Sequence, residues 1–329
     1  MNEVQKIVII LTLFGCFGCQ AQSNTKMVTN NPLICDLDSG SCEMPIQKTN
    51  IEDLNLSKKA TNLIKIIYYT DPICSSCWGI EPQLRKLKLE YGTYIEVEYR
   101  MGGLLPDWSY NSGGISKPAD VAQHWDEVSG HYDMPIDGDI WLEDPLDSSY
   151  PPSIAFKAAQ LQDQKMAILL LRELREMVFL QKKNIAKWEY LELAAAKVGL
   201  NKVQFKADYT GAAKIHFEQD LKMGKELGVR GFPTLFFIDA IGNKEIVYGA
   251  QPYSTFEQAF LKLLPTSSKT NYDKTWASLF SKYQTLTARE FSTLAETPRK
   301  DSENYLNELT LLGKLEKFTI KNGSIWKLK

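Results

Sequence analysis

A C-x-x-C motif formed by Cys74 and Cys77 lies between an apolar run and a helical pattern, and this position constrains the fold more than any other feature of the chain. The run at 63–69 (LIKIIYY) is rich in β-branched and aromatic residues and predicts a buried strand. The segment 78–91 has apolar residues at helical spacing. The motif is therefore expected at a strand-to-helix turn, where the first N–H groups of the helix and the helix dipole favour the thiolate of Cys74.

This placement predicts thiol–disulfide exchange, in which Cys74 is the nucleophile and Cys77 attacks the mixed disulfide to release the partner. Two other interpretations are half of a zinc site and an inert structural disulfide. Zinc is disfavoured because the folded part of the sequence has no second C-x-x-C and its three histidines are scattered (His124, His131 and His216). The strand-to-helix junction disfavours the inert disulfide. We expect no metal and no cofactor.

A second signal is the segment 231–234 (GFPT), which precedes another apolar run at 235–238 (LFFI). A proline at the mouth of a strand can have a cis peptide bond, and such a bond usually lies in a tight turn. Pro233 also lacks an N–H group. The segment is a weak signal alone and becomes specific when it is paired with an upstream C-x-x-C.

With these two motifs the chain resembles the DsbA branch of the thioredoxin superfamily, and within it the FrnE-like members. The matching stretches are YYTDPICSSCWGIEPQLRKL (68–87), SIAFKAAQLQ (153–162), LRELREMVFLQKKNIA (171–186) and KELGVRGFPTLFFIDAIG (225–242). The resemblance covers about residues 60–265. It implies a thioredoxin fold and a protein thiol–disulfide oxidoreductase.

The resemblance also implies roles for individual residues. Cys74 would be the exchange nucleophile, Cys77 the resolving thiol, and Pro233 a cis-proline lying against them. Phe232, which follows Gly231, would offer backbone groups to a bound peptide that adds as a strand. The two catalytic thiols would form the redox-active disulfide Cys74–Cys77.

Residues around the motif leave several questions open. The two residues between the cysteines are Ser75 and Ser76, so neither position holds a His or a Pro. An oxidase, an isomerase and a reductase are therefore all compatible with the sequence. Asp71 either accepts a proton from the resolving thiol or caps the turn with Pro72. Trp78 is either part of a substrate surface or a packed aromatic. The candidate substrate-binding residues are Gly231, Phe232, Ser75, Ser76 and Trp78.

The N-terminal sequence predicts a targeting signal. Lys6 precedes an apolar stretch at 7–15 that has the length of a signal-peptide core. A lipobox-like sequence favours lipidation of Cys16 or Cys19, and cleavage near residues 21–22 would instead release a soluble protein. Each outcome predicts export to the cell envelope (periplasm), with a lipid anchor if a cysteine is modified. A start at Met27 would instead give a cytosolic protein.

A second cysteine pair, Cys35 and Cys42, flanks a turn-forming Asp-Ser-Gly segment. In an exported chain these residues predict a structural disulfide. A sharper hypothesis is a second redox pair that exchanges with Cys74 and Cys77, because a short loop contributes little closure entropy to a large core. Free thiols and metal binding are the remaining alternatives.

The sequence predicts an α/β thioredoxin-like fold with a large helical insertion, followed by a small winged-helix-like α+β unit. The expected parts are a signal peptide at 1–22, an extension with the Cys35/Cys42 loop at 23–60, a DsbA-like domain at 61–265 and the C-terminal unit at 266–329. The insertion is expected at about 107–225, where strand signals are absent.

The C-terminal unit is predicted from local signals. A capping box from Thr287 to Glu290 opens one helix, 301–312 forms a second, and an Asn-Gly pair joins two strands at 315–320 and 324–328. This order suggests DNA binding through Arg299, Lys300 and Lys321. Two glutamates on the would-be reading helix, Glu303 and Glu308, and a net charge of −2 disfavour nucleic acid as a partner.

Two classes of function follow. The first is an enzyme that exchanges disulfides with exported client proteins and is recycled by a redox partner. The alternative comes from the resemblance, since some cytosolic relatives of this fold are adaptors that deliver a regulator to a protease. In that case the dithiol is non-catalytic or serves as a sensor. The predicted signal segment favours the enzyme, and a start at Met27 would favour the adaptor.

Overall fold

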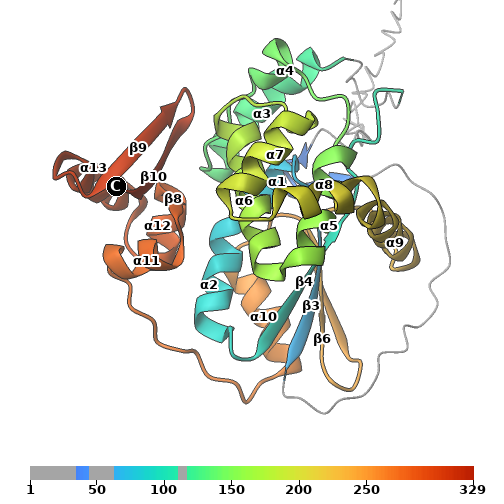
Figure 1. Cartoon of the computed structure of the whole chain (residues 1–329). Helices are drawn as coiled ribbons and strands as arrows, with labels where there is room; N and C mark the ends of the chain where they lie inside the picture. Colours follow the sequence, from blue (N-terminus) through green and yellow to red (C-terminus); the bar gives the residue numbers. More distant parts are fainter. Residues whose placement is uncertain (1–34, 44–62, 110–116) are drawn as a thin grey trace, which may run out of the picture.

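A four-stranded sheet forms the centre of the computed structural model, which describes residues 35–43, 63–109 and 117–329 (Figure 1). Its strand order is β4-β3-β6-β7, with β3 parallel to β4 and the other pairs antiparallel. The strands are β3 (Ile64–Thr70), β4 (Ile95–Met101), β6 (Thr234–Ile238) and β7 (Lys244–Tyr248). This arrangement confirms the predicted thioredoxin-like fold. Strand β3 is interior to the sheet and almost wholly buried, which explains its continuous apolar sequence.

The predicted active-site helix is divided in two. Helix α1 (Ser75–Gly79) carries the cysteine motif, and α2 (Glu81–Tyr91) follows after Ile80. Pro82 lies in the first turn of α2 and has no N–H to donate to the carbonyl of Trp78, so the helix is interrupted at this point. Helix α10 (Tyr253–Leu263) closes the domain and packs near α2.

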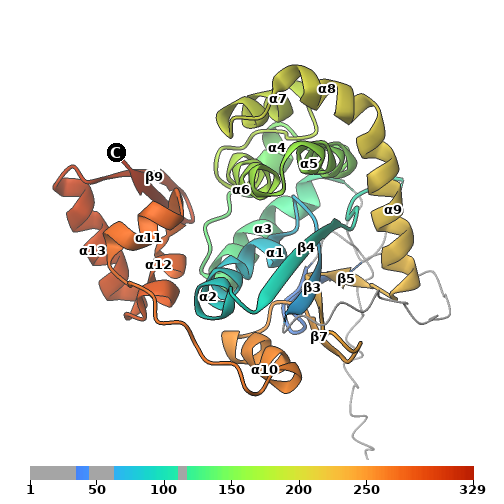
Figure 2. The same cartoon turned by 60° about the horizontal axis from the view of Figure 1, so that its bottom comes forward.

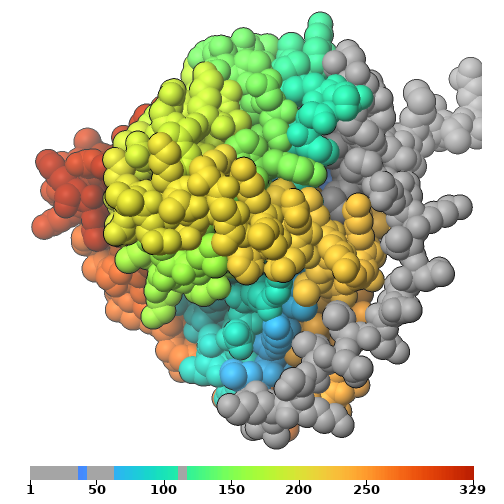
Figure 3. All heavy atoms as spheres, turned by 45° about the vertical axis from the view of Figure 1, so that its right-hand side comes forward, coloured from blue at the N-terminus to red at the C-terminus, as the bar shows by residue number. Residues whose placement is uncertain are grey.

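A helical insertion separates the two halves of the thioredoxin fold. Its helices are α3 (Ala119–Tyr132), α4 (Ile140–Glu143), α5 (Tyr150–Gln162), α6 (Gln164–Leu180), α7 (Trp188–Lys197), α8 (Lys202–Thr210) and α9 (Ala212–Glu226). They gather above one end of the sheet, and α9 runs down beside it (Figures 1 and 2). In the space-filling view the green and yellow insertion covers much of the visible face (Figure 3).

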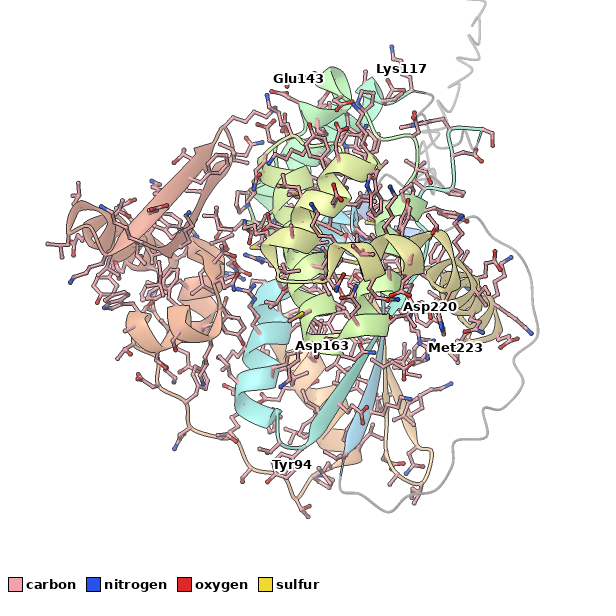
Figure 4. The ribbon with its side chains drawn as sticks, in the orientation of Figure 1. Tyr94, Lys117, Glu143, Asp163, Asp220 and Met223 are labelled. Carbon is pink, nitrogen blue, oxygen red and sulfur yellow. The ribbon has the colours of Figure 1, made fainter. Side chains whose placement is uncertain are left out.

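A buried ionic cluster fixes α9 to the sheet. Asp220 of α9 is fully buried and lies where α9 meets the end of β4 (Figure 4). Its carboxylate accepts from the guanidinium of Arg100 at 2.7 Å, from the ammonium of Lys157 on α5 at 2.9 Å, and from the N–H of Met101 at 3.0 Å. One carboxylate therefore joins the sheet to two helices of the insertion.

The C-terminal unit has its own hydrophobic core. Its elements are α11 (Trp276–Lys282), β8 (Thr285–Thr287), α12 (Ala288–Ala295), α13 (Arg299–Leu311), β9 (Leu315–Ile320) and β10 (Gly323–Leu328). The antiparallel sheet has the order β8-β10-β9. The predicted capping box at Thr287 and Glu290 is confirmed, whereas the sequence signals missed α11 and β8. The unit lies to one side of α2 and α6 (Figure 1).

Buried charges join this unit to the thioredoxin domain. Glu290 is fully buried and accepts two hydrogen bonds from the guanidinium of Arg172 on α6, at 2.9 and 3.1 Å. The guanidinium of Arg85 on α2 lies 3.2 Å from the same carboxylate. Glu290 therefore closes the capping box of its own helix and also anchors the unit to two helices of the other domain.

Candidate functional site

The cysteine motif lies at the predicted strand-to-helix turn. Cys74 is the N-cap of α1, and its sulfur accepts a hydrogen bond from the N–H of Cys77 at 3.2 Å. Both cysteines are buried free thiols, so the structure holds the reduced form of this pair. The Phe232–Pro233 peptide bond is cis, as the resemblance implied.

An N-terminal hairpin lies against the dithiol. Strands β1 (Cys35–Asp36) and β2 (Ser41–Glu43) pair antiparallel, and β2 pairs antiparallel with β5 (Gly231–Phe232). The register places Cys42 opposite Phe232, the residue directly before the cis-proline. The Sγ atoms of Cys42 and Cys74 are 3.3 Å apart. The hairpin therefore occupies the backbone edge that the resemblance assigns to a bound peptide.

Cys42 takes part in a disulfide. The register places Cys35 directly opposite it, as a Cys35–Cys42 disulfide requires, while the side chain of Cys35 lies outside the described part of the structure. The lipidation predicted for Cys16 or Cys19, and the whole predicted signal peptide, also lie outside the described residues. Within the described residues, no helix is both long and apolar enough to cross a membrane.

The sulfurs are enclosed on every side that the structure describes. Cys42, Cys74 and Cys77 each have 0% of their surface exposed. Ser76 is also buried, and its hydroxyl lies 3.5 Å from the sulfur of Cys42 and 2.7 Å from the hydroxyl of Tyr132 on α3. A second protein cannot reach Cys74 unless the hairpin moves.

A buried arginine of the insertion sets the charge at the dithiol. Arg175 of α6 hydrogen-bonds the hydroxyl of Thr70 at 2.6 Å and the carboxylate of Glu81 at 2.5 Å. Burial raises the pKa of Cys74 well above its usual range. Burial also raises the pKa of Cys77, but the hydrogen bond from Cys74 and the positive charge of Arg175 outweigh it and leave the pKa lowered. Cys77 is therefore the more acidic thiol of the pair, which is the reverse of the thiolate predicted on Cys74, because burial of Cys74 outweighs the helix N-terminus.

Sequence reasoning missed Arg175, although a signal was present. The residue lies four positions after Leu171 and three before Val178, on the apolar face of an amphipathic helix. A charge on that face calls for a buried partner. The partners come from residues roughly a hundred positions away in the chain, so the sequence pattern alone could not name them.

Asp71 acts as a cap in this structure. Its carboxylate accepts from the N–H of Ile73 at 3.0 Å, the N–H of Leu104 at 2.8 Å and the hydroxyl of Ser149 at 2.9 Å. These bonds fix the turn before Cys74 and the loop after β4. Burial raises its pKa to about 6, against the opposing effect of these hydrogen bonds. The role of proton acceptor for Cys77 stays a prediction.

Trp78 is a packed aromatic. It is fully buried, its indole N–H donates to the carbonyl of Pro135 at 3.1 Å, and its ring stacks on Phe179. The guanidinium of Arg172 lies 4.3 Å from the ring centroid, so Trp78 also touches the group that binds the C-terminal unit. Its place in the candidate substrate-binding set is therefore not supported by the structure.

Two of the three cations considered for DNA binding are occupied by carboxylates of this chain. Arg299 pairs with Asp133 at 2.7 Å, and Lys321 contacts Asp126 at 2.7 Å and Asp139 at 2.6 Å. These contacts tie the C-terminal unit to helix α3 and to the segment that follows it. They give these residues a packing role.

The comparisons with known proteins match this geometry. A family model described as Thioredoxin matches residues 68–258. The ClpXP adapter protein SpxH of Halalkalibacterium halodurans is 33% identical, with 90% of this chain and 97% of that protein covered. The protein of the same name from Bacillus subtilis is 27% identical, with 80% and 89% covered. A solved structure of a candidate protein disulfide isomerase from Nitrosomonas europaea has a TM-score of 0.55 at 19% identity, covering 63% of this chain and all of that one.

These relatives correct several predictions. The prediction of a protein thiol–disulfide oxidoreductase enzyme is wrong, because relatives that span most of the chain are named as adapters. The predicted partners, which were exported client proteins and a redox partner that recycles the dithiol, are also wrong. The names of the relatives give the ClpXP protease as their partner. The envelope location, with or without a lipid anchor, is contradicted by the same match to ClpXP adapters. The chain belongs to the DsbA-like thioredoxin family, together with these relatives.

Proposed function

We propose that this protein is an adaptor for the ClpXP protease, which binds a client protein and brings it to the protease in the cytosol. The observation that carries this proposal is the match to a ClpXP adapter at 33% identity over 90% of this chain and 97% of the relative. A match over 90% of this chain extends beyond residues 68–258, which the thioredoxin family model matches. An adaptor role draws on binding surfaces and needs no reactive group.

The enclosed dithiol supports the same proposal. An exchange enzyme has to present its nucleophilic sulfur and the edge beside the cis-proline to another protein. Here Cys74 is fully buried and that edge is paired with β2 of the same chain. The cysteines are therefore non-catalytic toward clients, and a sensing role is open to them.

The two-part architecture also suits an adaptor. The thioredoxin domain and the C-terminal unit have separate hydrophobic cores, and the buried contacts of Glu290 with Arg172 and Arg85 hold them together. Two units held in a fixed relation can present one surface to a client and another to the protease. Within its family we place the chain with the FrnE-like members, because of the long insertion between β4 and β5.

The test is protein turnover in the native host. Half-lives of the whole proteome would be measured with and without the gene, and again in a strain that lacks ClpXP. We expect a small set of ClpXP-dependent proteins to become long-lived when the gene is removed. Normal half-lives should return with the wild type and equally with the Cys74→Ser/Cys77→Ser double variant.

Two results would count against the proposal. If removing the gene changed no half-life that depends on ClpXP, the adaptor role would be lost. If the wild type restored turnover and the double variant did not, the dithiol would be required for delivery, and the non-catalytic assignment would be wrong.

A further inference from the structure

The hairpin 35–43 lies in the position that a peptide substrate of the dithiol would occupy. The resemblance expects a peptide to add as a strand beside the cis-proline, and β2 makes that pairing, with Cys42 opposite Phe232. We infer that Cys74 exchanges disulfides with Cys42, so that the hairpin and the C-x-x-C motif form one intramolecular redox circuit. This inference goes beyond the adaptor role and does not depend on it.

The position of the sulfur atoms carries the inference. Cys42 takes part in a disulfide, and its Sγ lies 3.3 Å from the free thiol of Cys74. Reacting atoms held at about 3–3.5 Å are in the range from which intramolecular reactions proceed efficiently. The two residues come from segments 32 positions apart, so strand pairing, and not local chain geometry, brings them together.

Several contacts hold the hairpin in this position. The carbonyl of Gly40 accepts from the N–H of Ala250 at 2.6 Å, and the hydroxyl of Ser41 donates to the hydroxyl of Tyr248 at 2.9 Å. Gly40 has a φ of +64°, and a Cβ there would lie 2.7 Å from the backbone nitrogen of Ala250. The turn of the hairpin is therefore fitted closely against the segment that follows β7.

The exchange balances without an added oxidant or reductant. Cys74 attacks the sulfur of Cys42, its proton passes to Cys77, and the disulfide of Cys42 breaks. The leaving sulfur, which we assign to Cys35 because the register places it opposite, takes the electron pair and departs as a thiolate. Cys77 then passes its proton to the Cys35 thiolate and attacks Cys74. This step forms the Cys74–Cys77 disulfide and releases the sulfur of Cys42 with the electron pair, and that sulfur takes a proton from solvent. Two electrons pass from the C-x-x-C pair, which is oxidised, to the hairpin pair, which is reduced.

The enclosed site explains why the partner is intramolecular. The thiol of Cys74 is fully buried, and the described atom nearest to it that can accept its attack belongs to Cys42. A tethered partner also has a high effective concentration, against which dilute thiols compete poorly. Transfer of the disulfide away from the hairpin leaves it without its covalent bridge, so the circuit links the redox state of the chain to how firmly the hairpin covers the peptide edge.

The test traps the intermediate in full-length protein. The Cys77→Ser variant would be quenched in acid, blocked with N-ethylmaleimide and digested with trypsin without reductant. The tryptic peptide 27–48 contains both Cys35 and Cys42, and the peptide 66–85 contains Cys74. We expect these two peptides to be found linked, with fragment masses that assign the link to Cys42.

Matched variants separate docking from chance collision. In the Cys77→Ser background, Gly40→Ala should reduce the linked peptide by about tenfold, because it lifts the hairpin and lowers the effective concentration of Cys42. Gly130→Ala is the control, since a Cβ at Gly130 meets no atom within 4 Å, and it should leave the yield unchanged. The inference would be overturned if the peptides stayed unlinked, or if Cys42→Ser gave the same yield through Cys35.

A measurement on the wild type keeps the inference testable if Cys77→Ser folds poorly. Protein holding one disulfide would be prepared from both directions, by one equivalent of dithiothreitol on the oxidised form and one equivalent of oxidised dithiothreitol on the reduced form. Exchange between the pairs predicts the same distribution of blocked cysteines from either direction. Two distributions that persist would show that the pairs do not communicate.

Discussion

The two ends of the described chain are attached to the thioredoxin domain by different chemistry. The N-terminal hairpin lies on the cis-proline edge through strand pairing and a close contact between two sulfurs. The C-terminal unit is anchored by a buried carboxylate, Glu290, between two arginines. The contact of the N-terminal hairpin can be broken and formed again by thiol–disulfide exchange, and its loss leaves no buried charge without a partner. The contact of the C-terminal unit cannot be broken without leaving a charge buried and unpaired.

Helix α6 lies between these two contacts. Arg175 faces the dithiol, and Arg172, three residues earlier and so on a neighbouring part of the helix surface, binds Glu290. Arg172 also stacks on Trp78, the residue after Cys77. One helix therefore supports both the dithiol that the hairpin covers and the ionic joint to the C-terminal unit.

The largest expected effect is at the ionic joint. Glu290→Gln leaves Arg172 and Arg85 without their shared carboxylate, and we expect a loss of about 3–5 kcal/mol in the free energy of unfolding. Chemical denaturation of the full chain would measure this loss. The control is Glu303→Gln, because Glu303 forms a half-exposed pair with Arg299 and should cost less than about 1 kcal/mol. Equal losses for the two variants would show that the buried Glu290 contributes no more to stability than the half-exposed Glu303.

The same carboxylate predicts acid sensitivity. Burial raises the pKa of Glu290, but Arg172 and Arg85 outweigh it and hold the pKa below its unfolded value of 4.5. Its contribution to stability is therefore complete above that pH and is lost as the pH falls through the lower, folded value. The wild type should lose stability on acidification more steeply than Glu290→Gln, and parallel curves would contradict this.

Asp71, in the turn before Cys74, predicts the opposite dependence of the free energy of unfolding on pH. Its pKa rises from 3.8 in the unfolded chain to about 6 when buried, so its ionisation opposes folding as the pH rises through this window. A shift of about two units corresponds to about 3 kcal/mol. The free energy of unfolding of the wild type relative to Asp71→Asn should therefore fall by about 2 kcal/mol, most of this amount, between pH 4 and pH 7. An unchanged difference would show that Asp71 does not titrate in this range.

The cis-proline edge should tolerate little added volume. A Cβ on Gly102 would lie 1.7 Å from the ring of Phe232, the residue that pairs with Cys42. Gly102→Ala should therefore cost about 1–3 kcal/mol through overpacking. It should also speed the blocking of Cys42 and Cys74 by alkylating agents once both are reduced. If the stability and the reaction rate stayed at wild-type values, the hairpin would not depend on this packing.

The smallest expected effect is at the tip of the C-terminal hairpin. Lys321 contacts Asp126 and Asp139, and its side chain is about one-third exposed. Solvent screens such a pair, so Lys321→Ala should cost less than about 1 kcal/mol in the free energy of unfolding. A loss as large as that of Glu290→Gln would mean that the joint between the two units extends to this tip.

Much of the fold could be predicted from local patterns. The strands around 63–69 and 235–238, the capping box at Thr287 and the Asn-Gly hairpin all depend on residues close in sequence. The elements α11 and β8 were missed because a seven-residue helix and a three-residue strand have too few positions for a periodic signal.

The site was only partly predictable. The C-x-x-C motif and Pro233 were found because each carries its own local chemistry. The partners that decide their behaviour, Arg175 and Cys42, reach them through contacts between distant segments. Cys42 was noticed as part of a pair, but only the register of β2 with β5 places it against Cys74. The prediction of a catalytic dithiol is wrong because the relatives are named as adapters, and the packing of the hairpin over the sulfurs had no signal in the sequence.

The adaptor role can be tested by binding of the purified full-length protein to purified ClpXP. We expect a complex with a dissociation constant in the micromolar range or tighter. The Cys74→Ser/Cys77→Ser variant should bind within about twofold of the wild type, because the dithiol lies beneath the hairpin and does not form the contact. No detectable binding by the wild type would contradict the adaptor role, and binding lost only in the double variant would contradict the separation of the dithiol from that role.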